Sequence, residues 1–127
     1  SDNSLRGLRH AISVAQPTDA TITGLYVVNI HPKEAIRFST QQRKKEISFA
    51  ERVIAEATAL AARSGVNFKP KTDSGNPAEK ITKMANDGDY DLVVIGSRGR
   101  GAGKEMFLGS VSNHVLHKAD APVMIVK

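Results

Sequence analysis

Hydrophobic residues recur along the chain with two spacings, one typical of helices and one typical of strands. In residues 39–64 they return every three or four positions and form one apolar stripe, which predicts a long amphipathic helix. Residues 92–95 are instead a continuous aliphatic run, as in a strand that is covered on both faces. The same reasoning predicts helices at 4–16, 39–64, 75–88 and 110–119, and strands at 20–30, 66–73, 91–97 and 122–127.

Several residues mark the expected ends and inward faces of these elements. Asn76 suits an N-cap and Pro77 the first position of the helix that follows. Glu79 falls at the third position, and Pro17 is expected to end the first helix. Pro70 places the strand at 66–73 near a sheet edge, because proline has no N–H to donate. The inward faces of the two helices at 39–64 and 110–119 are expected to contain Ile47, Ala50, Val53, Ile54, Ala57, Leu60 and Ala61, and Val111, Val115 and Leu116.

The order of the predicted elements is a strict alternation of helix and strand. Such alternation is typical of βαβ units, so the sequence predicts the α/β class, with an open parallel sheet and helices on both faces. Residues 1–127 are about the right length for a single domain with one core. The chain begins with a helix, whereas a doubly wound fold begins with a strand.

Composition narrows the classes of function. No apolar stretch reaches the roughly 20 residues that span a bilayer, so no membrane segment is expected. The absence of cysteine excludes thiolate chemistry and fits a cytoplasmic location. A net charge of +5 favours anionic partners, although a solvated basic surface has the same signature. Aromatic residues make up only 5% of the chain, which argues against a single-stranded nucleic acid as the partner.

The segment that joins the strand at 91–97 to the last helix is rich in glycine and carries the candidate chemistry. Ligands of open α/β sheets bind at the carboxyl ends of strands, where glycine lets backbone N–H groups approach closely. The start of the following helix adds unpaired N–H donors and the positive end of its dipole. Phosphate is the natural ligand of such a set. The glycines and the cations of this segment are Gly96, Gly99, Gly101, Gly103 and Gly109, and Arg98, Arg100 and Lys104.

Common phosphate motifs do not fit this segment. A Walker A motif would need glycine at Arg98 and serine or threonine at Glu105, and a dinucleotide fingerprint that begins at Gly99 meets Lys104. A GxxG motif of the KH type could be formed by residues 96–99, but such a motif joins two helices, whereas these residues follow a predicted strand. A loop in which the glycines are merely permissive is the alternative. We identify no catalytic nucleophile or base, and no metal site, and interpret His114 and His117 as polar helix surface.

The glycine spacing resembles that of a known family. The pattern Gly96-x₂-Gly99-x₉-Gly109-Ser110, with "DLVVIGSRGRG" around its start, is similar to the G-2x-G-9x-G-(S/T) signature of universal stress proteins of the ATP-binding (UspA-like) type. This resemblance covers essentially the whole chain. It implies an adenine nucleotide alpha hydrolase-like, Rossmann-like fold with a five-stranded parallel sheet in the order 3-2-1-4-5. It also implies ATP, with Mg²⁺, as the ligand.

The resemblance assigns the binding residues. Val27 would touch adenine and Ile95 would lie under the nucleotide. The remaining residues would line the phosphate and ribose side, with Arg98 acting mainly through its backbone. The nucleotide-binding set is therefore Val27, Ile95, Gly96, Arg98, Gly99, Gly109, Ser110, Val111 and Ser112.

The family begins with a strand that ends in an acidic residue, and residues 1–12 resemble the turn and helix that follow it. The first strand is thus expected to be absent from these residues, and either a preceding or a swapped segment is expected to take its place in the sheet. The resemblance further implies a homodimer through the last strand, 122–127. The predicted function is a nucleotide-dependent regulator of the stress response, with at most weak ATPase activity. The alternative is an interaction module of the same fold that does not bind nucleotide.

Overall fold

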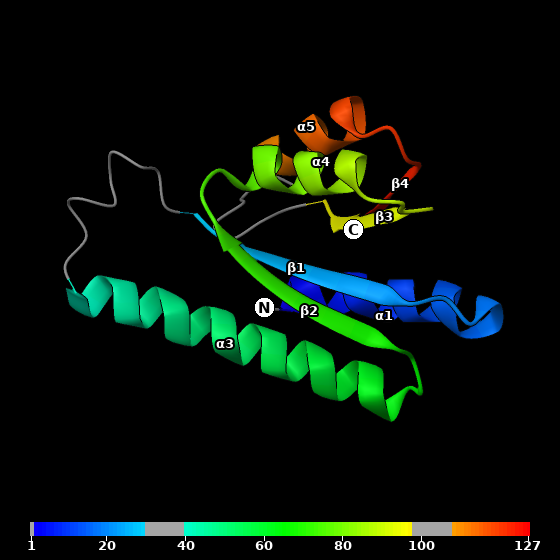
Figure 1. The fold of residues 1–127 in the computed structure, drawn as a ribbon, viewed down its shortest axis with the longest axis horizontal. Coiled ribbons are helices and arrows are strands. Elements are labelled where there is room, and N and C mark those ends of the chain that lie inside the picture. Colours follow the sequence, from blue (N-terminus) through cyan, green and yellow to red (C-terminus); the bar gives the residue numbers. More distant parts are fainter. Residues whose placement is uncertain (1, 30–39, 98–107) are drawn as a thin grey trace.

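The computed structural model describes residues 2–29, 40–97 and 108–127. Helices and strands alternate through these residues, as the hydrophobic pattern predicts (Figure 1). The class is therefore α/β. The elements are α1 (Asp2–Thr18), β1 (Ile22–Val28), α3 (Thr40–Arg63), β2 (Phe68–Ser74), α4 (Pro77–Asp87), β3 (Val93–Gly96), α5 (Ser110–Lys118) and β4 (Val123–Val126).

The strands form two parallel pairs. β1 pairs with β2, from Ile22 opposite Phe68 to Val28 opposite Ser74. β3 pairs with β4, from Val93 opposite Val123 to Gly96 opposite Val126. Within the described residues, no strand pairs β1 to β3, so the sheet consists of two halves. In the expected order 3-2-1-4-5, which counts a strand ahead of α1 as the first, β1, β2, β3 and β4 correspond to strands 2, 3, 4 and 5. Both observed pairs are therefore neighbours in that order, and the complete order stays a prediction.

Helices cover both faces of the strands. In Figure 1, α1 and α3 lie on one side, and α4 and α5 lie on the other. α1 contacts both β1 and β3, so it bridges the two halves of the sheet. The main buried cluster is Ile12, Ala15 and Val66, against which Leu8, Ile22 and Leu60 pack.

The start of α4 follows its sequence signals closely. The side-chain oxygen of Asn76 accepts a hydrogen bond from the N–H of Glu79 at 3.1 Å, which confirms the predicted N-cap. Pro77 occupies the first turn, and the N–H of Gly88 donates to the carbonyl of Met84 at the other end. Gly75 has φ +131°, a conformation that favours glycine.

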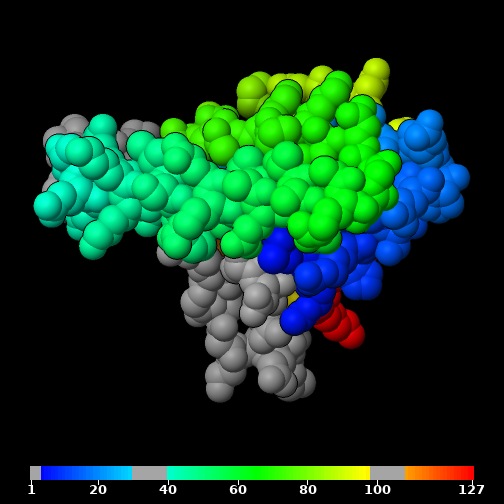
Figure 2. All heavy atoms as spheres, turned by 90° about the horizontal axis from the view of Figure 1, so that it is seen from below, coloured from blue at the N-terminus to red at the C-terminus, as the bar shows by residue number. Residues whose placement is uncertain are grey.

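Three sequence-based expectations were wrong. α1 continues through Pro17 to Thr18, because a proline in the last turn removes a single backbone hydrogen bond. Ile47 is 53% exposed, since the N-terminal part of α3 extends beyond the other described elements (Figure 2). Leu116 is 40% exposed, because α5 packs mainly against α4 and β4 among the described elements. None of the described helices is long and apolar enough to cross a membrane.

Candidate functional site

Two backbone hydrogen bonds of Ser97 join the end of β3 to β4 and to the start of α5. The N–H of Ser97 donates to the carbonyl of Val126 at 2.8 Å, which extends the β3–β4 ladder by one residue. The N–H of Gly109 then donates to the carbonyl of Ser97, also at 2.8 Å. The glycine-rich segment therefore returns to the strand end at which it begins. The helix start and the strand end form one junction at the carboxyl edge of the sheet.

The buried side chain of Ser112 contacts both ends of this junction. It is 2% exposed, and its Oγ lies 3.1 Å from the carbonyl oxygens of both Ser97 and Gly109. Because its hydroxyl proton is directed to these carbonyls, the side chain supports the loop ends. We expect any contact of Ser112 with a ligand to come from its backbone N–H.

The first turn of α5 presents backbone donors. Gly109 is the N-cap and has no side chain to satisfy the N–H groups that follow. The first intrahelical bond runs from the N–H of Asn113 to the carbonyl of Gly109 at 2.9 Å. The N–H groups of Ser110, Val111 and Ser112 precede that bond, so the helix itself offers them no acceptor. Ser110 is exposed and places a hydroxyl at the same opening.

The other strands reach the same edge. The N–H of Gly75 donates to the carbonyl of Val28 at 2.9 Å, so β1 ends beside the start of α4. Val27 and Ile95, which the resemblance assigns to the nucleotide, are partly buried near the ends of β1 and β3. The structure thus brings Val27, Ile95, Gly96 and the start of α5 to one edge. Arg98 and Gly99 lie outside the described residues.

A charged pair beside this edge was missed by the sequence reasoning. The pKa of the Asp73 carboxyl lies below its usual value, first because the N–H of Ser74 donates to its Oδ1 at 2.8 Å. The Nζ of Lys80, 3.5 Å from Oδ2, lowers this pKa further, while lost hydration acts in the opposite direction. The signal that could have revealed the pair is positional, since Asp73 lies near the end of β2 and Lys80 lies on the first turn of α4.

His114 differs from its interpretation as polar surface. It is partly buried, and its Nδ1 lies 3.2 Å from the Oγ1 of Thr82 on α4. His117 is exposed. Among the described residues, no three His, Asp or Glu side chains gather in a way that could hold a metal ion. His114 thus lies between α5 and α4, and His117 lies at the surface of α5.

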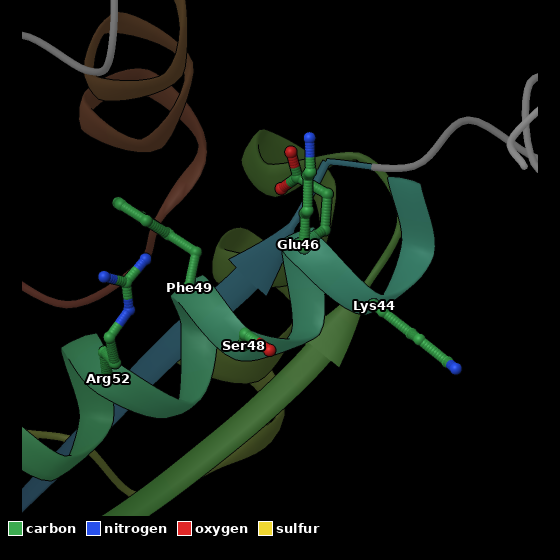
Figure 3. A pocket seen from close by; sticks show the side chains of 6 residues that line it. Lys44, Glu46, Ser48, Phe49 and Arg52 are labelled. Carbon is green, nitrogen blue, oxygen red and sulfur yellow. The ribbon is translucent and has the colours of Figure 1, made fainter. Parts of the chain in front are cut away.

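A hollow of about 470 Å³ lies on α3, and its described lining includes no residue of β3 or α5. Figure 3 shows that Lys44 and Arg52 point in different directions from the helix, so their charges do not converge on one point. The guanidinium of Arg52 lies 5.8 Å from the centre of the Phe49 ring. We assign no site to this surface. Its described lining residues all come from α3: Lys44, Lys45, Glu46, Ser48, Phe49 and Arg52.

Known proteins resemble this chain over its whole length. A family model described as the universal stress protein family matches residues 1–127. Universal stress protein YxiE of Bacillus subtilis is 35% identical over 118 residues, which cover 93% of this chain and 76% of that protein. UspA from Lactobacillus plantarum has a similar structure, with a TM-score of 0.86 at 25% identity, over 100% of this chain and 91% of that chain. The universal stress protein from Archaeoglobus fulgidus, solved in complex with dAMP, has a TM-score of 0.76 at 22% identity, over 100% of this chain and 90% of that one.

Proposed function

This chain belongs to the universal stress protein family, and on that premise we propose that it binds ATP at the β3–α5 junction and acts as a nucleotide-dependent regulator. The observation that supports this proposal is the hydrogen bond from the N–H of Gly109 to the carbonyl of Ser97, which holds the uncapped start of α5 at the carboxyl end of β3. A helix start with free N–H donors and a positive dipole end is suited to phosphate.

The phosphates would contact the backbone of residues 109–112 and the hydroxyl of Ser110. Gly96 would allow the nucleotide to approach the end of β3 without meeting a side chain. Val27 and Ile95 would supply the apolar contacts to the base and the underside of the nucleotide. Arg98 and Gly99 complete the proposed set. The related protein solved with dAMP supports this assignment only to the extent that it shows an adenine nucleotide bound to the same fold.

We infer that Mg²⁺ would enter with the nucleotide. The donors that the structure describes at the junction are mainly backbone N–H groups, which bind anions and do not ligate cations. Magnesium in phosphate sites is commonly held by phosphate oxygens and water with few protein ligands. Binding would therefore rest on the helix start, and any hydrolysis would be slow without a positioned base.

We also propose a homodimer through β4. Met124 and Val126 lie opposite Val94 and Gly96 in the β3–β4 ladder. The other edge of β4 pairs with no described strand, and such an edge invites pairing with a second chain. Light scattering at micromolar concentration should give twice the mass of the chain, and a monomer would refute this assembly.

Isothermal titration with Mg-ATP, AMP and cyclic AMP tests the nucleotide proposal. Heat is expected with at least Mg-ATP, and competition should show that the adenine nucleotides share one site. The matched pair of variants is Ser110→Asp, which puts a carboxylate at the proposed phosphate position, and Ser13→Asp, which makes the same change on an exposed part of α1. Ser110→Asp should abolish the heat and Ser13→Asp should retain it. No heat with any of the three nucleotides would favour the alternative, an interaction module without a nucleotide.

A further inference from the structure

The outer edge of β2 is the side of that strand that faces away from β1, and no described strand pairs with it. The N–H of Gly75 donates to the carbonyl of Val28 on β1, and the carbonyl of Asn67 accepts from Ile22, so the odd-numbered residues of β2 bond toward β1. In a parallel ladder, alternate residues direct their N–H and C=O groups to opposite sides. The even-numbered residues therefore direct theirs to the outer edge. They are Phe68, Pro70, Thr72 and Ser74.

Two of these four positions offer no N–H group to a further strand. Pro70 has none, and the N–H of Ser74 already donates to the Oδ1 of Asp73 at 2.8 Å. The donors that remain, those of Phe68 and Thr72, are separated by about 13 Å along the strand. A ladder needs a donor at every other residue, so a strand placed against this edge would make only isolated bonds.

A cation from α4 holds the Asp73 carboxylate in place. The Nζ of Lys80 lies 3.5 Å from the Oδ2 of Asp73. Gly75 makes this contact possible, because a Cβ built on it would lie 3.1 Å from the Cε of Lys80, which is tighter than ordinary van der Waals contact. A cation near the start of a helix is disfavoured by the helix dipole, and the carboxylate offsets this cost. The pair is therefore part of the connection between β2 and α4.

The same carboxylate opposes an incoming strand electrostatically. Its oxygen occupies the position from which a carbonyl of a partner strand would accept the N–H of Ser74, so two acceptor oxygens would face each other. Lys69 and Lys71 are exposed on the same strand, and pairing would remove water from their charges. Proline and charged side chains are the usual means by which natural sheets prevent pairing at an edge.

The free edge of β4 has none of these features. The N–H of Ser97 donates to the carbonyl of Val126, so the even-numbered residues of β4 bond toward β3. Val123 and Ile125 therefore direct their N–H and C=O groups to the free edge. Residues 123–126 are apolar and include neither a proline nor a charge. Of these two edges, that of β4 is open to strand pairing and that of β2 is closed.

We propose that Pro70 and the carboxylate of Asp73, held by Lys80, close the outer edge of β2, so that a second copy of this chain can add to β4 but not to β2. Pairing of one β4 with another closes on itself at two chains, whereas an open edge at β2 would let further copies add and would produce filaments. This inference rests on the pairing of β1 with β2, and it requires neither the nucleotide nor the β4 homodimer.

Opening the edge of β2 tests the proposal. Pro70→Thr restores one outward N–H and Asp73→Ala frees that of Ser74, so the double variant offers a donor at every outward position. The matched control is Pro17→Thr/Asp120→Ala, which makes the same two exchanges at exposed positions outside the strands. Light scattering at roughly 100 µM should give the double variant at least twice the mean mass of the wild type, rising with concentration. The control should have the wild-type mass.

Hydrogen exchange at single amides locates the association. In the double variant, the amides of Phe68 and Thr72 should become roughly tenfold more protected as the concentration is raised. The amide of Lys71, which already bonds toward β1, is the internal reference. The single variant Asp73→Ala tests the closure separately. Its Ser74 amide should lose protection by about threefold or more relative to the wild type, while the amide of Thr72 stays unchanged.

Each outcome decides the proposal. Equal masses of the double variant and the wild type would overturn it, as would an equal rise in the control or a rise without protection of Phe68 and Thr72. If the double variant is unfolded by circular dichroism, the single variant decides, because unchanged protection of Ser74 overturns the closure and its loss supports it. An opened variant that associates but gives no heat with Mg-ATP would contradict only the nucleotide proposal. A wild-type monomer that associates only when the edge is opened would contradict only the β4 homodimer.

Discussion

The starts of α4 and α5 lie at the same edge of the sheet but are built differently. Asn76 caps α4, and Glu79 adds an acidic residue to its first turn. α5 begins at Gly109, with no side-chain cap and no acidic residue in its first turn. The N–H of Glu79 in the first turn of α4 is thus satisfied by a capping side chain, whereas within the described residues no side chain caps the first turn of α5. Under the proposed function, the start of α4 serves stability and the start of α5 serves binding.

The strongest way to break this comparison is to give α5 a cap like that of α4. Gly109 has φ −64° and ψ 162°, which any residue adopts, so Gly109→Asp introduces no backbone strain. Its carboxylate would accept from the first-turn N–H groups and repel phosphate. The Kd for Mg-ATP should rise roughly 30-fold, which corresponds to about 2 kcal/mol. Isothermal titration measures this, and Ser13→Asp, which adds the same carboxylate on an exposed part of α1, is the control that should stay close to the wild-type Kd. An unchanged Kd in Gly109→Asp would contradict binding at this helix.

Removing the existing cap of α4 should lower the stability of the protein and leave nucleotide binding unchanged. Asn76→Ala deletes the acceptor of the Glu79 N–H and should lower the free energy of unfolding by about 1 kcal/mol. The Kd for Mg-ATP should not change. Urea denaturation gives the stability, and Asn67→Ala, which removes an exposed bond to Thr21, should cost less than about 0.5 kcal/mol. A variant that binds ATP poorly at full stability would reverse the roles assigned to the two helices.

A smaller effect on stability is expected at Ser112, the buried side chain that supports the β3–α5 junction. Ser112→Ala removes a buried hydroxyl that donates to the carbonyls of Ser97 and Gly109, and it should cost about 0.5–1 kcal/mol. The cost is limited because both carbonyls keep a backbone donor. Ser13→Ala, at an exposed bond to Arg9, should have almost no effect on the urea midpoint. Equal midpoint shifts in the two variants would contradict a supporting role for Ser112.

The smallest effect concerns acid stability beside the start of α4. Since the pKa of Asp73 is lowered in the folded protein, the stabilisation is present above its unfolded value of about 3.9 and is lost as pH falls through the lower folded value. Asp73→Asn should therefore reduce the loss of stability between about pH 5 and pH 3. Urea midpoints across this range measure it. A steeper loss in the variant than in the wild type would contradict the direction of the shift.

The features that could be predicted from the sequence are those set by residues close together in the chain. Asn76, Pro77 and Glu79 act within one turn, so their spacing alone placed the start of α4. The periodicity of residues 39–64 predicted α3 but could not show how far β1 and β2, against which α3 packs, extend along it, which is why Ile47 was expected to be buried.

The candidate site depends on contacts between distant parts of the chain. Gly109 follows Ser97 by twelve positions, and the bond between them exists only because β3 and α5 pack in this arrangement. The glycine spacing identified both ends of this segment through the family resemblance. Two further contacts join separate elements, the pair of Asp73 with Lys80 and the contact of His114 with Thr82. Neither can be predicted from a local sequence pattern.

The central claim is that the open start of α5 holds the phosphates of the nucleotide. Titration of ¹⁵N-labelled protein with Mg-ATP, followed by amide chemical shifts, tests it most directly. The largest shifts are expected at residues 110–112, with the capped first turn of α4 at 77–80 changing little. Saturating shifts centred on α4, or no shifts at residues 110–112 while ATP binds, would contradict the account.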